Sequence, residues 1–369
     1  MNAKTFLLKL IDGVDVTING TRAWDITVHN EALYSRILCD GSLGFGEAYM
    51  DGWWDCEAMD VMFCKLIRAG LECRCRLSLP ALRTAAAHVL FNLQNAKRAF
   101  MVAEQHYDMD NTMFAHMLGE TMNYSCAYWK DAETLDQAQR AKMELICKKL
   151  NLEKGMTVLD IGCGWGGLAR HMAETRGVRV TAVTVSRPQW EFATENHKGL
   201  PITWLLEDYR RLTGHFDRIV SVGMFEHVGR KNYPVFFRKA RTLLKDDGLF
   251  LLHTIGNNRG KTGVDPWINR YIFPNGVLPS LESLSGTVAR HFIMEDWHNF
   301  GSHYDKTLMA WYERFAQGYA ARDFVCDERK FRMFRYYLLS CAGAFRARDL
   351  QLWQLALSPS GCVGGYDCR

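Results

Sequence analysis

The sequence predicts an α/β protein, in which helices cover both faces of a parallel sheet, with a smaller and mainly helical domain at the N-terminus. Three observations support this. From residue 133 onward, short apolar runs alternate with helical patterns, which is typical of parallel sheets. A glycine-dense turn follows the first of these runs. The first hundred residues differ in texture, with short β-like pieces and turns followed by helical stretches.

The N-terminal domain, predicted over residues 1–100, begins with β-like pieces such as "DVTING" and "WDITVHN". The stretch "CDGSLGFGEAYMDGWWDCE" is rich in glycine and is predicted to form turns, with Trp53 and Trp54 in one of them. Helical spacing of apolar residues extends from about Ala58 to Phe100. The remainder, residues 101–369, is predicted to be the catalytic domain.

From Glu133 onward the elements follow a regular order. "TLDQAQRAKMELICKKLNL" has helical periodicity, and strands are then predicted in "MTVLDIG", "VRVTAVTV", "ITWLLED", "FDRIVSVG" and "GLFLLHTIG". Ligands of such sheets bind beyond the carboxyl ends of the strands. The residues at these ends are therefore the first candidates for a site: Asp160, Thr184, Asp208, Glu226 and His253.

Positive charge is concentrated in one segment. Residues 61–100 hold seven lysines and arginines and one glutamate, a net charge of +6, whereas the whole chain carries +4 and the remainder therefore −2. A basic block of this kind favours phosphates, on nucleic acid or on an anionic membrane face. A solvated helical surface is the alternative interpretation.

Cysteine usage and the ends of the chain suggest a cytoplasmic protein. The twelve cysteines form no C-x-x-C pair and no cluster with zinc spacing, so we expect reduced thiols and no metal. The apolar core of "MNAKTFLLKLIDG" is too short for a signal peptide, and no run approaches the roughly 18 apolar residues of a membrane span. The glycine-rich tail "SPSGCVGGYDCR" is expected to be mobile.

The glycine-dense turn "VLDIGCGWGGLARHM" has the G-x-G-x-x-G spacing of dinucleotide-binding proteins at Gly162, Gly164 and Gly167. Two details favour S-adenosylmethionine over NAD. Asp160 ends the strand before the glycines, where a carboxylate would repel a pyrophosphate but suit an ammonium or sulfonium group. The next strand, "TAVTVSRPQ", lacks the acid that would accept ribose hydroxyls. We therefore expect an adenosylmethionine loop.

Further motifs carry a resemblance to a known family. They include "NYSCAYW", "VSVGMFEHVG", "LFLLHTIG", "GSHYDKT" and "CAGAFRARD". With the glycine loop, they resemble the cyclopropane-fatty-acyl-phospholipid synthases and the related mycolic acid cyclopropane synthases, from about Asp40 to Gln354. The resemblance implies a Rossmann-like class I adenosylmethionine-dependent methyltransferase sheet. It also implies transfer of a methyl group to the cis double bond of a phospholipid acyl chain, with closure of a cyclopropane ring.

That reaction has chemical requirements of its own. An alkene is a weak nucleophile, so the methyl group must be delivered in a dry, tightly shaped pocket. The resulting carbocation needs aromatic faces rather than nucleophiles, and a base must remove a proton from the new methyl group. The resemblance implies that this base is bicarbonate, held by Cys126, Glu226, His253, the amide of Ile255 and Tyr304. Cys341, in "CAGAFRARD", is a further catalytic candidate, although the mechanism requires no covalent nucleophile.

The resemblance also implies how the cofactor is bound. Tyr124 and Ser125 would lie near its methionine end. Thr184 and Gln189 would contact the ribose, and Asp208 and Tyr209 would flank the adenine. The loop around the amino acid and sulfonium would comprise Leu159, Asp160, Ile161, Gly162, Cys163, Gly164, Trp165, Gly166 and Gly167.

An unsaturated phospholipid substrate gives the basic segment a role at an anionic membrane surface, on the inner face of the cytoplasmic membrane. We expect no nucleic acid partner, and the resemblance suggests a homodimer. Three alternatives stay open: a methyltransferase that stops at a methyl branch or hydroxyl, an NAD-dependent oxidoreductase, and a basic RNA- or lipid-binding module with a vestigial fold. Intact Cys126, Glu226, His253 and Tyr304 argue against the last.

Overall fold

The computed structural model describes residues 2–71, 111–258, 260 and 263–368. They form two compact units that alternate along the chain. Of the described residues, the first unit takes 2–71, 263–274 and 304–350, and the second takes the rest. Two segments from the predicted catalytic domain thus pack with the N-terminal residues. The boundary predicted at residue 100 lies outside the described residues and stays a prediction.

The first unit is mainly helical, as predicted for the N-terminal residues. Helix α15 (Glu328–Arg346) packs against α2 (Ala32–Met50) and α3 (Met59–Arg68). Aromatic rings fill this contact: Phe45 stacks on Trp54 at 4.2 Å, and Tyr336 of α15 lies 5.8 Å from Tyr49. The other elements are α1 (Ala3–Leu10), β1 (Thr27–Val28), β2 (Trp54–Asp55), α12 (Pro266–Tyr271) and, from Tyr304 on, α14 (Ser302–Ala321).

The glycine-rich stretch predicted to form turns is mostly helix α2, so that prediction is wrong. Its glycines permit close packing rather than chain reversal. A Cβ on Gly46 would lie 2.4 Å from the indole of Trp267, and one on Gly44 would lie 2.5 Å from the carbonyl oxygen of Arg36. Gly41 alone departs from helical geometry, with φ 59°. The predicted turn does follow the helix and includes Trp53, but Trp54 lies in strand β2, so its placement in the turn is wrong.

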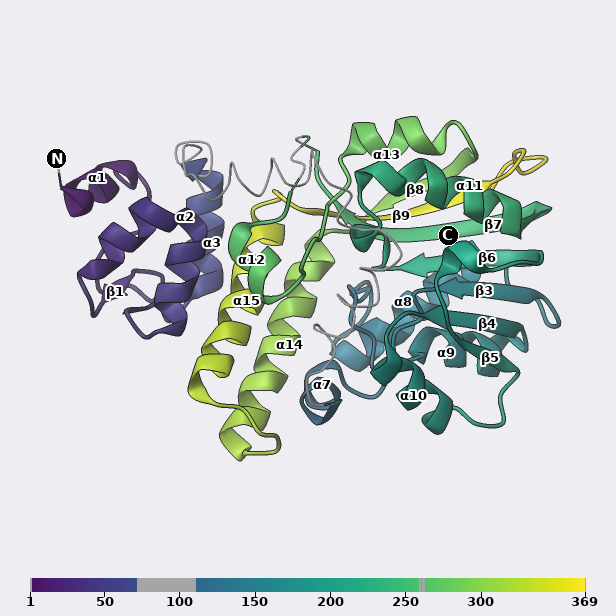
Figure 1. The fold of residues 1–369 in the computed structure, drawn as a ribbon, viewed down its shortest axis with the longest axis horizontal. Helices are drawn as coiled ribbons and strands as arrows, with labels where there is room; N and C mark the ends of the chain where they lie inside the picture. Colours follow the sequence, from purple (N-terminus) through teal and green to yellow (C-terminus); the bar gives the residue numbers. More distant parts are fainter. Residues whose placement is uncertain (1, 72–110, 259, 261–262, 369) are drawn as a thin grey trace. The chain divides into compact units, whose positions relative to one another are not determined.

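The second unit contains a seven-stranded sheet with the order β5-β4-β3-β6-β7-β9-β8 (Figure 1). The five strands predicted from the sequence run parallel. Two further strands, β8 (Ile293–Asn299) and β9 (Gln351–Ser358), pair antiparallel at one edge and were not predicted from the sequence. The five parallel strands are β3 (Thr157–Ile161), β4 (Arg179–Thr184), β5 (Ile202–Leu206), β6 (Phe216–Val222) and β7 (Leu244–Gly256).

Helices cover both faces of this sheet, as predicted. Apolar strand residues pack against α11 (Tyr233–Leu243) and α13 (Leu281–Val288) on one face, and against α8 (Leu135–Lys149) and α9 (Gly167–Arg176) on the other. Because side chains alternate along a strand, Asp160 shares the α8 face with Val158, whereas Leu159 points to the other face.

Shorter elements complete the second unit. They are α7 (Asn111–Leu118), α10 (Arg187–Asn196) and the 3-10 turns η1 (Tyr209–Arg211), η2 (Phe225–His227) and η3 (Arg230–Asn232). Within the described ranges, no helix is long and apolar enough to span a bilayer.

The C-terminal tail is docked on the second unit, so the prediction of a mobile tail is wrong. The hydroxyl of Tyr366 donates to the carbonyl oxygen of Lys149 at 2.7 Å, and the amide of Cys362 donates to Glu295 Oε1 at 2.8 Å. Both side chains pack against the apolar cluster beneath α8 and α9. These two contacts hold a segment whose glycine content alone suggested mobility.

Candidate active site

The candidate site lies at the carboxyl ends of β3, β6 and β7. The strand order changes direction between β3 and β6, and ligands of doubly wound sheets bind at such a switch point. The segment before α8 reaches the same edge, since a Cβ on Gly223 after β6 would lie 3.9 Å from that of Ser125. Gln139 of α8 fixes this segment, because its Nε2 donates to the carbonyl oxygens of Asn123 and Ser125 at 3.2 and 3.0 Å.

The glycine loop is shaped for close approach of a ligand. Gly162, Gly164 and Gly166 have φ of 83°, 58° and 90°, which side chains rarely adopt. Gly167 begins α9 so close to the segment before α8 that a Cβ would lie 2.0 Å from the carbonyl oxygen of Thr121. Glycine at these positions therefore lets the loop adopt this geometry without backbone strain or a steric clash.

Asp160 is an unpaired carboxylate at the mouth of this loop. The side chain is 2 % exposed, and no described residue forms a hydrogen bond to its buried Oδ2. Burial raises the pKa of Asp160 to about 7, and the charge of Lys142 opposes that rise. A buried carboxylate oxygen without a donor suits a ligand cation. The residues present therefore fit adenosylmethionine, which carries an ammonium and a sulfonium.

The other predicted cofactor residues lie at neighbouring strand ends. At β4, the hydroxyl of Thr184 donates to Gln189 Oε1 at 3.2 Å, which orients the amide that stands in place of an acid. After β5, Asp208 pairs with Arg210: the backbone amide and the guanidinium of Arg210 both donate hydrogen bonds to the Asp208 carboxylate. Tyr209 packs edge-on against Phe236, with ring centroids 5.4 Å apart.

The aromatic members of the predicted cofactor set rest on α7. The ring of Tyr124 lies 5.5 Å from that of Phe114, and Trp165 Nε1 donates to Asn111 Oδ1 at 3.1 Å. The remaining members are buried in or beside the sheet: Leu159, Ile161 and Cys163.

Glu226 is the proton acceptor of a candidate acid–base pair, in which His253 is the second member. It lies in η2, after β6, and its Oε1 accepts a hydrogen bond from the amide of Ile255 at 2.7 Å. Its Oε2 is buried, with no hydrogen-bond partner among the described residues. Burial raises the pKa of Glu226 to about 7. The free oxygen can therefore accept a proton near neutral pH.

His253, near the end of β7, is the other member of this pair. Gln354 Nε2 lies 3.2 Å from its Nδ1, and this orientation of the amide favours the tautomer in which Nδ1 accepts and Nε2 carries the proton. No described residue accepts from this buried Nε2. Burial, together with the charges of Lys142 and Lys149, lowers the pKa of His253 well below its usual value. The ring is thus a neutral donor, two residues along the strand from the Ile255 amide.

Cys126 and Lys142 complete the polar cluster of the second unit. Cys126 is fully buried, and its thiol donates to the carbonyl oxygen of Ala127 at 3.3 Å. Lys142 is also fully buried, and its Nζ donates to Ser125 Oγ at 2.9 Å. Sequence analysis did not single out Lys142. The signal was its position, because residues 135, 142 and 149 recur every seven residues on the apolar face of α8.

The remaining catalytic candidates, Tyr304 and Cys341, belong to the first unit. Tyr304, on α14, is 9 % exposed and packs against Phe345 with ring centroids 4.5 Å apart. Burial raises the pKa of Cys341, on α15, to about 12, which keeps the thiol protonated and makes it a poor nucleophile. The structure therefore groups four of the predicted catalytic residues, Cys126, Glu226, His253 and Ile255, in the second unit.

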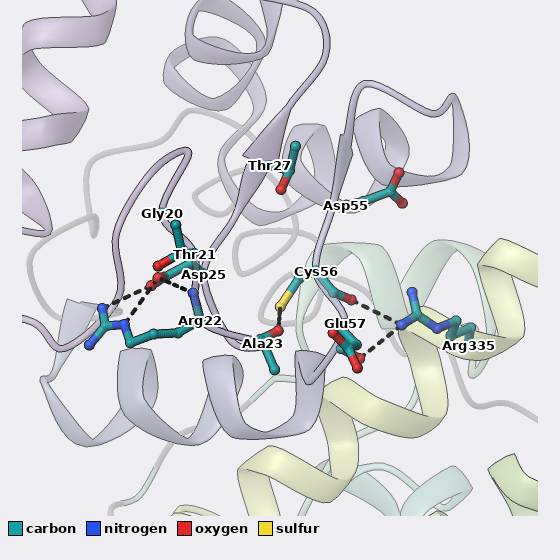
Figure 2. Close-up of a pocket in the computed structure, with 10 residues that line it drawn as sticks. All are labelled: Gly20, Thr21, Arg22, Ala23, Asp25, Thr27, Asp55, Cys56, Glu57 and Arg335. Carbon is teal, nitrogen blue, oxygen red and sulfur yellow. Dashed lines mark hydrogen bonds and ion pairs between the residues drawn. The ribbon is translucent and has the colours of Figure 1, made fainter.

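A cavity of about 440 Å³ in the first unit contains none of the predicted site residues (Figure 2). Its two arginines are held by partners in the cavity wall. Arg335 Nη2 donates to the carbonyl oxygens of Cys56 and Glu57 at 2.9 and 3.0 Å, and Arg22 is held by Asp25. Unlike the strand ends of the second unit, it offers no buried polar atom that lacks a partner among the described residues.

Comparison with known proteins identifies the family of this chain. The sequence model described as Mycolic acid cyclopropane synthetase matches residues 94–355. The chain is 54 % identical to the cyclopropane-fatty-acyl-phospholipid synthase of Escherichia coli (strain K12) over 95 % of this chain and 92 % of that protein. Two solved structures each align with 70 % of this chain and 97 % of their own. They are the cyclopropane synthase MmaA2 from Mycobacterium tuberculosis (TM-score 0.65, 31 % identity) and the mycolic acid cyclopropane synthase CmaA1 complexed with SAH and CTAB (TM-score 0.63, 33 % identity).

The sheet order, the glycine loop and the unpaired Asp160 define a class I S-adenosylmethionine-dependent methyltransferase. The predicted fold class is confirmed, and adenosylmethionine is the cosubstrate. Within that class, the chain belongs to the mycolic acid cyclopropane synthetase family.

Proposed function

We propose that this enzyme converts cis double bonds of unsaturated phospholipid acyl chains into cyclopropane rings. The observation that supports this most directly is a pair of buried atoms, Glu226 Oε2 and His253 Nε2, which lack a partner among the described residues and lie near the ends of β6 and β7. Ring closure requires removal of a proton inside a dry site, and such a pair is suited to it. The named activity of the Escherichia coli relative is the second support.

Adenosylmethionine, when bound, supplies an electrophilic methyl group to the double bond, which leaves a carbocation on the acyl chain. The residues of this chain bind the cofactor before the methyl transfer and accept the proton after it. Asp160 would hold the cationic end of the cofactor, and the glycine loop would let the cofactor approach the backbone closely. Glu226 Oε2 is the final acceptor of the proton that leaves the new methyl group, and the C–H electron pair closes the ring.

The same atoms fit a bicarbonate ion, which would serve as the immediate base. His253 Nε2–H is a free donor for an oxyanion, and Glu226 Oε2 is a free acceptor for the proton of the ion. The Ile255 amide supports Glu226 directly, because it donates to Oε1. Cys126 lies in the segment before α8 of the same unit. Tyr304, which the resemblance also assigns to the ion, belongs to the first unit, and its part in holding the ion stays a prediction.

On the substrate side, we propose a peripheral protein on the inner face of the cytoplasmic membrane. The basic segment 61–100 would attract anionic lipid. The structure describes only residues 61–71 of this segment, so the proposal depends on the sequence for the rest. A homodimer is proposed from the resemblance, and the solution mass of the purified chain tests it.

The decisive experiment uses vesicles of unsaturated phospholipid and adenosylmethionine labelled in its methyl group. Mass analysis and proton NMR of the acyl chains should show labelled cyclopropane rings. A labelled methyl branch without ring protons would identify the methyl-branch alternative instead. If the cofactor binds in calorimetry but the label never enters acyl chains, the proposed substrate is wrong.

A further inference from the structure

Two lysines of α8 are fully buried, and their surroundings differ. Lys149 is neutralised by Asp296, with Nζ 3.0 Å from Oδ2. Lys142 Nζ has its hydrogen bond to Ser125 Oγ at 2.9 Å, but no acidic side chain of the described residues lies within ion-pair distance. A buried cation without a close counter-charge is costly and is retained only where other groups require it.

Lys142 interacts electrostatically with two parts of the site. Burial lowers the pKa of Lys142 to about 7, and Cys126, in the segment before α8, and Asp160, at the cofactor loop, oppose that fall. His253 is in turn affected by Lys142 and Lys149. Strand alternation explains the arrangement, since Asp160 and His253 both have the parity that faces α8. Lys142 is thus the charge common to the cofactor loop and the acid–base pair.

We propose that Lys142 is a positioning residue that couples cofactor binding to binding of a small oxyanion at Cys126, Glu226 and His253. Without ligands, Lys142 and Asp160 offset each other's charge. A cationic cofactor at Asp160 competes for that carboxylate, and the charge of Lys142 then favours an anion on its other side. Because coupling between two sites is reciprocal, the anion must strengthen cofactor binding by the same factor. The inference rests on the proposed function for the nature of the anion.

Calorimetry of the full-length protein without lipid tests the coupling. Adenosylmethionine is titrated in buffer freed of dissolved carbon dioxide, once with sodium bicarbonate and once with sodium chloride of equal ionic strength. We expect bicarbonate to tighten cofactor binding at least about fivefold, the lower end of typical coupling. The ratio of the cofactor dissociation constants without and with bicarbonate measures this coupling. In Lys142→Met this ratio should fall to one, and in Lys142→Arg it should be partly restored. Lys148→Met, at the exposed neighbouring position of α8, is the matched control and should behave as wild type.

Two results would overturn the inference: a wild-type ratio of one, or an undiminished ratio in Lys142→Met. If Lys142→Met does not fold by circular dichroism, Ser125→Ala removes the hydroxyl that holds Nζ, and an unchanged ratio there would also refute the coupling. The two proposals fail separately. Intact coupling without ring formation refutes only the proposed function, whereas ring formation with a ratio that ignores Lys142 refutes only the inference.

Discussion

Gly167→Ala tests whether contact between the glycine loop and the segment before α8 sets cofactor affinity. The added Cβ would lie 2.0 Å from the carbonyl oxygen of Thr121, which is about 1.3 Å less than the usual C···O contact. Because the clashing atom belongs to the backbone of Thr121, it cannot turn aside as a side chain would. The clash must therefore displace the segment that carries Tyr124 and Ser125. Misplacement of about 1 Å in a site can cost on the order of 10²-fold. We expect that loss in adenosylmethionine affinity.

Gly177→Ala at the other end of α9 is the matched control. Gly177 has φ 61°, and its nearest neighbour is the flexible side chain of Lys154, 3.2 Å from the added Cβ. The control should lose stability, by about 1–2 kcal/mol for a left-handed alanine, but keep cofactor affinity. Calorimetry gives the affinity, and thermal unfolding gives the stability. A wild-type affinity in folded Gly167→Ala would refute the reasoning, because the close approach would then be incidental.

Three further predictions follow from the site and the sequence. Because a proton acceptor must be ionised and burial raises the pKa of Glu226 to about 7, kcat at saturating cofactor should fall as pH drops below about 7, and Glu226→Gln should lower it by about 10²–10⁴-fold. A pH-independent kcat between pH 5 and about 8 would contradict this assignment. Cys341→Ser should retain most activity, since the buried thiol stays protonated; complete loss in a folded variant would show that the thiol is needed. Replacing four arginines of the basic segment by glutamine should abolish vesicle co-sedimentation at about 1 kcal/mol per charge and leave cofactor affinity intact, whereas unchanged co-sedimentation would remove the membrane role of Arg74, Arg76, Arg83 and Arg98.

The parallel part of the sheet could be predicted because its strands are buried on both faces and are nearly continuous apolar runs. Strands β8 and β9 lack that pattern. Glu295 and Asp296 interrupt β8, and β9 buries Gln351 and Gln354 whose amides find partners only after folding, in Asn299 and His253. Helix α2 was missed for a related reason: a glycine that fits against Trp267 looks in the sequence like one that turns the chain.

The residues of the candidate site also fall into a group that the sequence could predict and a group that it could not. Asp160, Glu226 and His253 could be predicted because topology brings the ends of parallel strands to one edge of a sheet. Lys142 and Gln354 could not, since they act on the site through contacts between α8 or β9 and those strand ends. A lysine in an amphipathic helix is ordinarily solvent-exposed, and only its heptad relation to Leu135 marks it as internal.

The packing of α15 limits how this enzyme can be shortened. Gly343 lies so close to α3 that a Cβ would be 2.6 Å from the carbonyl oxygen of Asp60, and Tyr336 is buried among Phe45, Tyr49 and Trp54. Deleting the N-terminal residues would leave this aromatic face in water and invite aggregation. The solved relatives, which align with only 70 % of this chain, therefore cannot be imitated by truncation at residue 100. A minimal version of this enzyme would need a redesigned outer surface on α15.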